Sequence, residues 1–337
     1  MNNINIGVIG YGYWGPNIVR NFFATSSCTI KIVADGRQER LNLLAKIFPS
    51  IQGVKDAEEV INNKEIDAVV IATPVFTHFG LAKRALLNGK HVLIEKPMTS
   101  SVAEADELIN LAAQKGLTLM ADHTFLYTGA VQKMKELIEK DMIGIPHYFD
   151  SARINLGLFQ PDINVLWDLA PHDISILTYL ITEVPESINA TGISHTRNQI
   201  ENIAYLTVNY NSSFIAHFNC SWSSPVKVRQ TLIGGDKKMI LYNDLEPSEK
   251  VRVYDTGYNH KTEEDRTRIM VDYRTGDVFI PKLSSREALA GVADDFVQSV
   301  IQKKSPLSNA LLGRSVVRIL EASQESIKNK GKEVKIK

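Results

Sequence analysis

The sequence predicts two domains: an α/β domain with a parallel sheet over residues 1–122, and an α+β domain with an open antiparallel sheet over residues 123–337. In the first part, short apolar runs alternate with segments of helical periodicity, which is typical of parallel strands joined by right-handed crossovers. In the second part, strand-like runs are joined by turn residues, which is typical of antiparallel hairpins. A length of 337 residues is ample for two hydrophobic cores.

The first domain is expected to contain five strands and five helices. The strands are expected at residues 5–10, 29–35, 68–72, 91–94 and 118–121, and the helices at 14–24, 37–47, 56–62, 76–88 and 101–115. Ser100 is a candidate N-cap for the helix at 101–115. Gly89 and Gly116 are expected to end two helices, since glycine tolerates the left-handed conformation at a C-cap.

The second domain is expected to begin with a helix at 129–140 and to end with helices at 284–303 and 309–329, which can pack back on the first domain. Strands are expected at 147–153, 187–194, 203–210, 213–221, 227–233, 239–243, 250–254 and 268–273, with a helix at 173–180 among them. Asn211-Ser212 and Gly234-Gly235 are expected to be hairpin turns. Residues 259–268 are polar and are expected to form an exposed loop.

Composition and charge exclude several classes of protein. Lys plus Arg and Asp plus Glu both total 38, so the net charge is zero and nothing favours a nucleic-acid partner. Two cysteines, Cys28 and Cys220, are too few for a disulfide framework or a zinc cluster, and they suit a reducing cytoplasm. No secretory leader and no apolar run of membrane-spanning length is evident. We expect a cytoplasmic protein without a membrane or metal partner.

The first strand is followed by the glycine turn Gly10-Tyr11-Gly12-Tyr13-Trp14-Gly15, and a helix follows this turn. In a G-x-G-x-x-G turn, the first glycine permits a tight bend, the second lets the backbone approach a pyrophosphate, and the third lets the helix pack against the strand. The helix then directs its positive dipole end at the phosphates. Tyr13 and Trp14 are expected on the nicotinamide side of the turn. The pattern predicts a dinucleotide site.

The second strand ends in Asp35, about 20 residues beyond the glycine turn. An acidic residue at this distance accepts hydrogen bonds from the adenosine ribose, and its charge repels a 2′-phosphate. The sequence therefore predicts NAD rather than NADP. Arg37 leaves a second interpretation open, because a guanidinium can stack on adenine or bind a 2′-phosphate. Asp35 as a simple turn residue is the remaining alternative.

Ligands of an open parallel sheet bind outside the carboxyl ends of its strands. The third strand is followed by Thr73 and Pro74, and His78 comes soon after them. Thr73 can hydrogen-bond a cofactor phosphate or ribose, Pro74 fixes the turn, and His78 can cap the same region. A surface histidine at a helix N-terminus is the alternative for His78.

The fourth strand is followed by Glu95-Lys96-Pro97, a charged pair beside a proline whose peptide bond can be cis. Burial and a nearby nicotinamide would lower the pKa of Lys96 and allow it to donate a proton. An ordinary surface ion pair is the alternative.

In the second domain, Asp168 and His172 are four residues apart and share one helical face. A carboxylate and an imidazole so placed can orient each other around a substrate hydroxyl. Two alternatives remain open. The two residues can be part of a metal site, for which no third ligand is evident, or Asp168 or Asp173 can be a helix N-cap.

These residues together resemble the glucose-fructose oxidoreductase / inositol dehydrogenase family of NAD(P)-dependent oxidoreductases, the Gfo/Idh/MocA family, over essentially the whole chain. The matching segments are Gly10–Gly15, Ala72-Thr73-Pro74 with His78, Gly89–Pro97, and Asp168 with His172. Glu95-Lys96-Pro97 is the most specific of them. The resemblance implies a Rossmann domain followed by a domain built on a large, mostly antiparallel sheet. The open face of that sheet commonly makes homodimer or homotetramer contacts.

The resemblance also implies catalytic roles. Lys96 matches the lysine that contacts the nicotinamide ribose and the reacting oxygen, and Asp168 and His172 match the aspartate and histidine of the catalytic group. The implied reaction is reversible oxidation of a ring hydroxyl to a ketone, with hydride exchanged at the nicotinamide. His172 is our first choice as acid/base, with Lys96 polarising the oxygen and Asp168 orienting the pair. The roles of Lys96 and His172 can also be exchanged.

Substrate contacts are expected from Tyr127, Arg153, Asn155 and Trp167, which lie near the entry to the second domain or close to Asp168 in sequence. An arginine and an asparagine can bind hydroxyl, carboxylate or phosphate groups, although Arg153 can equally be a surface residue and Tyr127 and Trp167 can be core aromatics. The pattern looks similar to the sugar-nucleotide branch, which acts at the 3-position of a nucleotide-linked hexose. A free polyol or inositol dehydrogenase is the alternative, and a non-catalytic NAD-binding regulatory protein is the alternative of another class.

Overall fold

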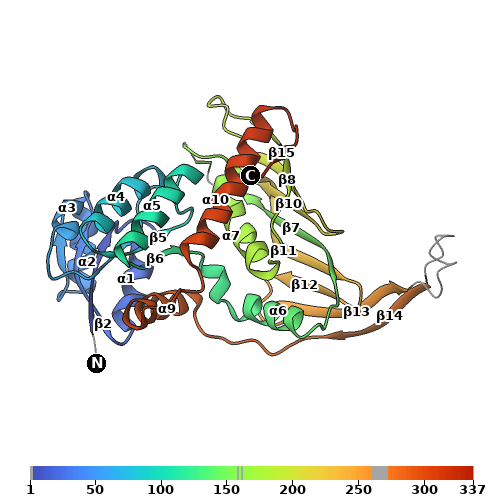
Figure 1. Ribbon diagram of the computed structural model, residues 1–337, viewed down its shortest axis with the longest axis horizontal. Coiled ribbons are helices and arrows are strands. Elements are labelled where there is room, and N and C mark those ends of the chain that lie inside the picture. Colours follow the sequence, from blue (N-terminus) through green and yellow to red (C-terminus); the bar gives the residue numbers. More distant parts are fainter. Residues whose placement is uncertain (1–2, 158, 161, 260–271, 337) are drawn as a thin grey trace. The chain divides into compact units, whose positions relative to one another are not determined.

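The computed structural model describes residues 3–157, 159–160, 162–259 and 272–336 (Figure 1). The chain forms two compact units. Unit 1 comprises Met1–Thr128 and Arg286–Arg318, and unit 2 comprises Gly129–Ser285 and Ile319–Lys337. These units differ from the predicted boundary after residue 122, because residues 123–128 and 286–318 group with the first domain.

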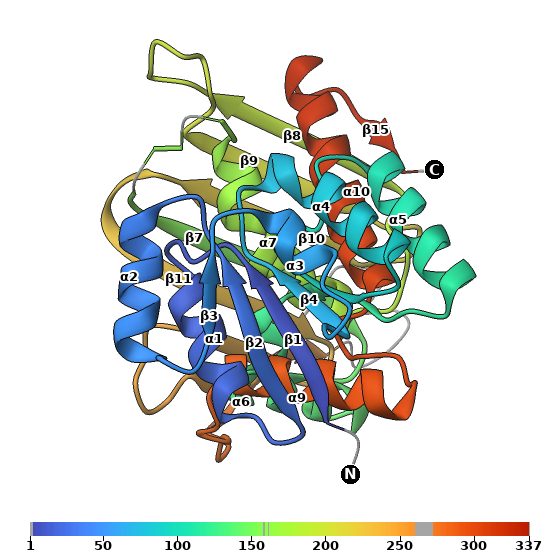
Figure 2. The same ribbon diagram turned by 90° about the vertical axis from the view of Figure 1, so that its left-hand side faces the viewer.

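Unit 1 is built on a six-stranded parallel sheet in the order β3-β2-β1-β4-β5-β6, part of which faces the viewer in Figure 2. Its strands are β1 (Ile4–Ile9), β2 (Cys28–Ala34), β3 (Gln52–Val54), β4 (Ala68–Ile71), β5 (His91–Glu95) and β6 (Leu119–Asp122). Every residue of β4 is buried, as expected of a parallel strand covered on both faces. The predicted α/β class is confirmed, but β3 was not predicted, because Gln52-Gly53-Val54 is too short and polar to register as a strand.

The helices of unit 1 are α1 (Gly15–Ala24), α2 (Gln38–Ile47), α3 (Ala57–Ile61), α4 (Val75–Leu87), α5 (Val102–Lys115), the 3₁₀ turn η1 (Thr124–Tyr127), α9 (Ala288–Gln302) and the first part of α10 (Ala310–Lys328). The N-cap of α5 is Ser101 rather than the predicted Ser100. Its hydroxyl accepts a hydrogen bond from the backbone N–H of Glu104, while the Glu104 carboxylate accepts one from the backbone N–H of Ser100. This reciprocal arrangement is a capping box displaced by one residue.

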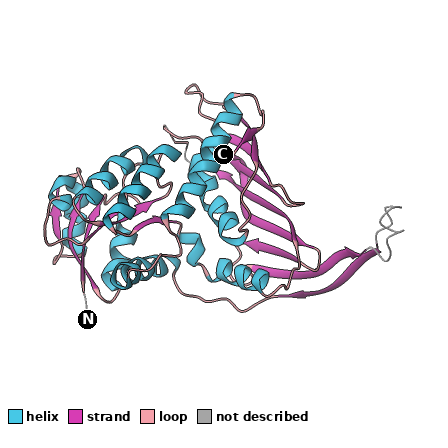
Figure 3. Ribbon diagram, in the orientation of Figure 1, coloured by secondary structure: helices cyan, strands magenta, loops and turns pink. Residues whose placement is uncertain are grey.

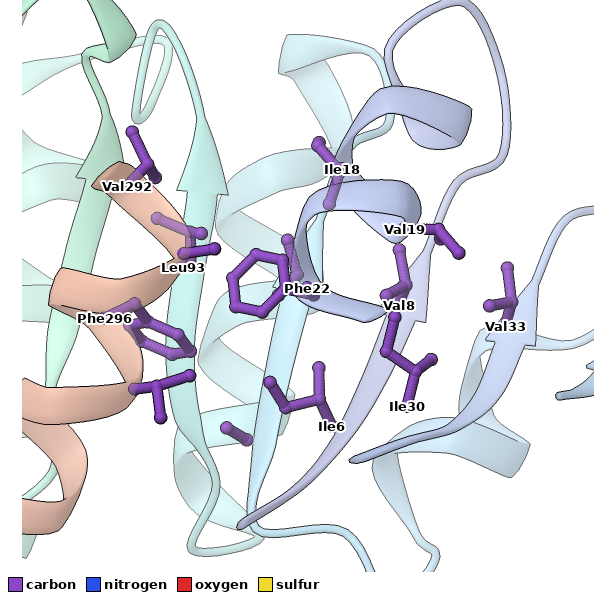
Figure 4. Packing of buried hydrophobic residues seen from close by; sticks show 14 of the residues in the cluster. Ile6, Val8, Ile18, Val19, Phe22, Ile30, Val33, Leu93, Val292 and Phe296 are labelled. Atoms are coloured by element: carbon purple, nitrogen blue, oxygen red, sulfur yellow. The ribbon is translucent and has the colours of Figure 1, made fainter. Parts of the chain in front are cut away.

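Helix α9 completes the core of unit 1 although it comes late in the sequence. The rings of Phe22 on α1 and Phe296 on α9 meet edge to face, with their centroids 6.2 Å apart (Figure 4). Val292 and Val297 belong to the same buried cluster as Ile6 of β1. Outside the core, the Glu287 carboxylate accepts two hydrogen bonds from the Arg20 guanidinium. These contacts explain why residues 286–318 group with unit 1.

Unit 2 contains a nine-stranded sheet in the order β14-β13-β12-β11-β7-β10-β9-β8-β15. The strands are β7 (Pro146–Leu156), β8 (Ser187–Ile193), β9 (Ile203–Asn209), β10 (Ile215–Ser221), β11 (Ser223–Gly235), β12 (Met239–Asn243), β13 (Val251–Asn259), β14 (Asp272–Phe279) and β15 (Val334–Lys335). All neighbouring pairs are antiparallel except β7 and β10. Helix α7 (Val165–Leu180) packs along one face of this sheet, and α6 (Gly129–Glu139) packs against α7 (Figure 3). The predicted large, mostly antiparallel sheet is confirmed.

Three local predictions for unit 2 were wrong or incomplete. Gly234 and Gly235 belong to the end of β11 and do not form a hairpin turn. Helix α7 begins at Val165 rather than at residue 173, because Asn164 caps it and Pro171 is accommodated inside it. Strand β15 was not predicted, and residues 260–268 of the expected loop lie outside the described residues. No helix of the described chain is long and apolar enough to cross a membrane.

Candidate active site

The glycine turn after β1 has the close approaches that the sequence pattern predicts. Gly10 has φ = 101°, and a Cβ atom there would come within 2.5 Å of the Ala72 carbonyl oxygen. A Cβ atom at Gly15 would come within 2.7 Å of the Gly10 carbonyl oxygen. At Gly12, by contrast, the nearest atom would be the Arg37 Nη2 atom at 3.4 Å. The first and third glycines are therefore required by the protein itself, whereas the second leaves space beside the backbone.

The N-terminus of α1 has the features that suit binding of a diphosphate group. Trp14 is the N-cap but makes no side-chain capping hydrogen bond, and the first turn contains no acidic residue. The positive end of the helix dipole is thus not neutralised by the helix's own side chains. Tyr13 is 86 % exposed and its ring packs edge to face against that of Trp14. Together with the space at Gly12, these features fit the pyrophosphate of a dinucleotide.

Asp35 is buried just after β2 and is held next to the glycine turn. Its Oδ2 atom accepts a 2.8 Å hydrogen bond from the backbone N–H of Tyr11, and its Oδ1 atom accepts one of 3.0 Å from the backbone N–H of Arg37. The half-exposed Arg37 guanidinium donates to both oxygens. Burial raises the pKa of Asp35, but the hydrogen bonds from Arg37 and Tyr11 outweigh burial and lower the pKa below its usual range. Asp35 is therefore ionised at neutral pH.

His78 on α4 joins the turns that follow β4 and β5. One ring nitrogen lies 2.9 Å from the Pro97 carbonyl oxygen and the other lies 2.8 Å from the Thr73 carbonyl oxygen. The interpretation of His78 as a surface histidine is wrong, since the residue is only 1 % exposed. Pro74 occupies the N-cap position of α4, and the Thr73 hydroxyl lies 2.6 Å from that of Thr77. His78 therefore positions two turns, and direct cofactor contacts by these residues remain predictions.

Glu95 and Lys96 lie at the carboxyl end of β5, beside the end of β6. The Lys96–Pro97 peptide bond is cis, and the Glu95 Oε2 atom accepts a 2.8 Å hydrogen bond from the backbone N–H of Lys96. Glu95 is paired in register with Asp122, the last residue of β6. Burial and the Asp122 carboxylate raise the pKa of Glu95 to about 8, against the opposing effect of Lys96. The two residues therefore do not form an ordinary surface ion pair.

Asp122 and His123 are the polar residues of this strand end that sequence reasoning missed. Burial raises the pKa of Asp122 to about 6, although a hydrogen bond from the Thr124 hydroxyl and the charge of Lys96 oppose the rise. His123 is fully buried, and neither of its ring nitrogens has a hydrogen-bond partner in the described chain. Burial and then Lys96 lower the pKa of His123 to about 3. The rule that ligands bind at the carboxyl ends of strands would have found both residues.

In unit 2, Asp168 and His172 lie one turn apart near the start of α7. The Asp168 Oδ2 atom accepts a 3.0 Å hydrogen bond from the indole N–H of the buried Trp222. Asp168 is not an N-cap, since the Asn164 side chain fills that role by accepting from the backbone N–H of Trp167. Trp167 and His172 are partly buried. The shared helical face that the spacing predicts is present, with Trp222 as an additional support for Asp168.

Arg153 and Asp173 form an ion pair in the interior of unit 2. Two hydrogen bonds of 2.7 Å join the Arg153 guanidinium to the two Asp173 carboxylate oxygens. Burial opposes the charge on Arg153, but the nearby Asp173 carboxylate outweighs it and raises the pKa of Arg153. Arg153 is therefore not a surface strand residue, and Asp173 is not an N-cap. Asn155 is partly buried beside Gly157 and Trp222.

The Tyr127 hydroxyl group is hydrogen-bonded to two other residues of unit 1. The hydroxyl donates a 2.7 Å hydrogen bond to the Asp295 Oδ2 atom and accepts one of 3.2 Å from the backbone N–H of Ser308. Burial and Asp295 raise the pKa of the Tyr127 phenol. The side chain also packs against the core cluster of unit 1. The structure thus agrees with the core-packing alternative for Tyr127, and a substrate contact by Tyr127 remains a prediction.

The predicted site residues gather in two sets. The strand ends of unit 1 hold the glycine turn, Asp35, Thr73, His78 and the Glu95-Lys96 pair, and α7 of unit 2 holds Trp167, Asp168 and His172. Among the described residues, no group of three or more His, Cys, Asp or Glu side chains could hold a metal ion. Lysine, histidine and aspartate side chains are residue types that serve in acid/base chemistry around an organic cofactor.

Comparison with known proteins identifies the relatives of this chain. Residues 4–123 match the model of an oxidoreductase family with an NAD-binding Rossmann fold, and residues 131–241 match the GFO/IDH/MocA C-terminal domain. UDP-N-acetylglucosamine 3-dehydrogenase of Acidithiobacillus ferrooxidans is 26 % identical over 335 residues, which cover 94 % of this chain and 95 % of that protein. Its solved structure has a TM-score of 0.79 at 25 % identity and covers 98 % of this chain and 99 % of its own.

Two further relatives span nearly the whole chain. The scyllo-inositol 2-dehydrogenase (NADP(+)) of Bacillus subtilis is 24 % identical, over 98 % of this chain and 95 % of that protein. The structure of GenD2 from gentamicin A biosynthesis in complex with NAD has a TM-score of 0.83 at 19 % identity, covers 100 % of this chain and 97 % of its own, and shares the fold. The glycine turn, the two sheets and the two matching family models all agree. The chain belongs to the Gfo/Idh/MocA family of NAD(P)-dependent oxidoreductases and acts on CH–OH groups.

Proposed function

We propose that this oxidoreductase interconverts a ring hydroxyl and a ketone at the 3-position of a nucleotide-linked hexose. The similarity to UDP-N-acetylglucosamine 3-dehydrogenase carries the proposal, because it extends over 94 % of this chain and 95 % of that protein. The chain also contains all three residues that the chemistry requires, Lys96, Asp168 and His172. A non-catalytic NAD-binding protein would be free to lose at least one of them, so their presence favours an enzyme.

The proposed mechanism divides the work between cofactor and protein. When bound, the nicotinamide supplies the hydride chemistry. His172 takes the proton of the substrate hydroxyl during oxidation and returns it during reduction. The Lys96 ammonium group stabilises the negative charge that develops on the same oxygen. Asp168, fixed by its hydrogen bond to Trp222, orients the imidazole. Exchange of the Lys96 and His172 roles is the alternative.

NAD is the proposed cofactor in preference to NADP. Asp35 is ionised and is anchored by the backbone N–H of Tyr11, so it offers a fixed acceptor for the ribose hydroxyls and repels a 2′-phosphate. Arg37 offers the opposing contact, but it is paired with the Asp35 carboxylate. The proposed location is the cytoplasm, since both cysteines, Cys28 and Cys220, are free thiols.

A screen for activity tests the proposed substrate class. The purified protein is incubated with NAD and either nucleotide-linked hexoses or free polyols, and reduced cofactor is followed by its absorbance. Oxidation of nucleotide-linked hexoses is expected, and the 3-keto product can be identified by mass spectrometry after borodeuteride reduction. Turnover of free polyols alone would replace the proposal by the second candidate, an inositol-type dehydrogenase, which the similarity to the Bacillus subtilis enzyme favours.

A further inference from the structure

A partly buried carboxyl group, Glu95, and a buried one, Asp122, lie at the aligned carboxyl ends of β5 and β6. Glu95 and Asp122 are register partners in these parallel strands, so their side chains leave the sheet on the same side, and adjacent strands are only about 4.8 Å apart. Asp122 is 2 % exposed. The edge beyond β6 is also covered, because the Ser308 hydroxyl donates to the Ala121 carbonyl oxygen and the Ser308 carbonyl oxygen accepts from the Ala121 N–H. The Asp122 carboxyl group is therefore poorly placed to be stabilised by bulk water, and Glu95 is only partly accessible to it.

One positive charge acts on both carboxyl groups. The charge of Lys96 favours the ionised form of Glu95 and of Asp122. If both carboxyl groups were ionised, their two negative charges would face the one charge of Lys96 in a largely desolvated environment, which is costly. Retaining one proton between the two carboxyl groups makes the cluster neutral. The pKa values of about 8 for Glu95 and about 6 for Asp122 agree with one retained proton near pH 7.

The other titratable groups around the cluster do not hold this proton. His123, with a pKa of about 3, is neutral, and burial lowers the pKa of His78. Tyr127, whose pKa is raised, stays protonated and donates its hydroxyl to Asp295. Among these groups of the described chain, Glu95 and Asp122 are therefore the ones whose pKa values, about 8 and about 6, span neutral pH.

The general rule for open parallel sheets predicts that the nicotinamide half of the cofactor would bind over this strand end. A dinucleotide lies across the carboxyl ends of the strands, with one mononucleotide on each half of the sheet. Asp35 follows β2 and marks the adenosine half, so the half with β4, β5 and β6 receives the nicotinamide. An oxidised nicotinamide ring carries a positive charge, whereas the reduced ring is neutral.

We propose that Glu95 and Asp122 share a single proton in the free protein and that binding of the oxidised, positively charged cofactor releases this proton to solvent. The carboxylic O–H bond breaks, the proton leaves to buffer, and no carbon bond changes. Both carboxylates then face two positive charges, those of Lys96 and of the nicotinamide. Reduced cofactor brings no charge and releases no proton, so the pair discriminates between the two redox states. The inference depends on the family cofactor and not on the proposed sugar.

Calorimetry of cofactor binding without any sugar tests the proposal. The apparent binding enthalpies of NAD⁺ and NADH are measured near pH 7 in buffers that differ in ionisation enthalpy. The slope against buffer enthalpy is expected to show release of about half a proton or more for NAD⁺ and essentially none for NADH. The affinity for NAD⁺ relative to NADH is expected to rise about tenfold between pH 6.5 and pH 8.5, since at most one proton is linked. Equal slopes for the two cofactors would overturn the proposal.

Matched variants locate the proton. Glu95→Gln and Asp122→Asn each remove one carboxyl group, so proton release by NAD⁺ is expected to disappear in both. Glu107→Gln serves as control, because Glu107 is a partly exposed carboxylate on α5 that pairs with Lys83. Release that persists in both strand-end variants would place the proton elsewhere and refute the assignment. If neither variant folds, as judged by circular dichroism, the comparison of NAD⁺ with NADH in the wild type still decides.

The result of the calorimetry can be distinguished from the result of the substrate screen. Proton release by NAD⁺ without turnover of any nucleotide-linked hexose would leave the carboxyl pair established and the proposed substrate class refuted. Turnover of a nucleotide-linked hexose, together with the same dependence on buffer enthalpy for NAD⁺ and NADH, would support the substrate class and refute the shared proton.

Discussion

Lys96 is the residue on which the proposed chemistry depends most directly. It lies at the carboxyl end of β5, where its charge acts on Glu95, Asp122, His78 and His123. The Lys96 ammonium group therefore influences both the candidate cofactor site and the protonation of the neighbouring side chains. The effects of changing Lys96 on binding and on turnover must therefore be measured separately.

Replacement of Lys96 by alanine is expected to lower turnover about a hundredfold or more, as is usual on loss of an acid/base or polarising group. The dissociation constant of NAD, measured by fluorescence quenching, is expected to change only a few-fold. Lys83→Ala, on the surface of α4, is the matched control and should retain full turnover. Unchanged turnover of the Lys96→Ala protein would remove Lys96 from the mechanism.

Asp35 is expected to set the preference between cofactors. Asp35→Ala removes a charged acceptor, so affinity for NAD should fall about tenfold or more, while affinity for NADP should fall less or rise. Glu39→Ala, at an exposed position in α2, is the control. The titrations are done at pH 7, where Asp35, with its lowered pKa, is ionised. A wild-type protein that binds NADP more tightly than NAD would contradict this assignment.

Whether a residue of the candidate site could be predicted depended on whether local sequence spacing or only tertiary packing reveals it. Gly10, Asp35, Lys96 and the Asp168/His172 pair could be proposed from the sequence, because local spacing and the ends of strands point to them. Trp222 was missed, since it lies in the bend between β10 and β11 and contacts Asp168 of α7, which is far away in the chain. The partners of Tyr127 and Arg153 were also missed, because hydrogen bonds to Asp295 and Asp173 depend on tertiary packing.

At the level of the elements, the first turn of α5 shows how a one-residue error in capping arises. Ser100 and Ser101 are adjacent and are chemically identical candidates. Only the Ser101 hydroxyl accepts from the backbone N–H of Glu104, at 3.3 Å. Ser101→Ala is expected to lower the free energy of unfolding by about 1 kcal/mol, as for other N-cap serines. Ser100→Ala is the control and should change it by less than about 0.5 kcal/mol. Urea denaturation measures both, and equal effects would contradict the assignment of the cap.

The contact between α7 and β7 depends on the buried pair Arg153–Asp173. Asp173→Asn leaves the guanidinium charge buried without its carboxylate and is expected to cost about 3–5 kcal/mol in stability, measured by thermal unfolding. The double variant Arg153→Met/Asp173→Leu should recover most of this loss, because it removes both charges. If the folded double variant loses affinity for the substrate, Arg153 also contributes to binding, as the sequence suggested.

At the level of the whole molecule, the open face of the nine-stranded sheet is the proposed contact between copies of the chain. Tyr205, Ile215 and Leu232 are partly exposed there, and each alternates along its strand with a buried residue. Tyr205→Lys with Ile215→Lys is expected to convert a dimer or tetramer into a monomer, because it places charge on an apolar surface. Val184→Lys, at another exposed apolar position, is the control. Light scattering after gel filtration gives the mass, and a wild-type monomer would refute the proposal.

Helix α9 belongs to the core of unit 1 but lies late in the sequence, and this has a consequence for synthesis of the protein on the ribosome. The core around Phe22 stays incomplete until Phe296 and its neighbours have been translated, after nearly all of unit 2 has emerged. Until then the amino-terminal segment exposes an apolar surface. Exposed apolar surface favours the binding of chaperones. Completion of the unit 1 core is in this sense delayed until after synthesis of residues 129–285, although its sheet comes from the first part of the chain.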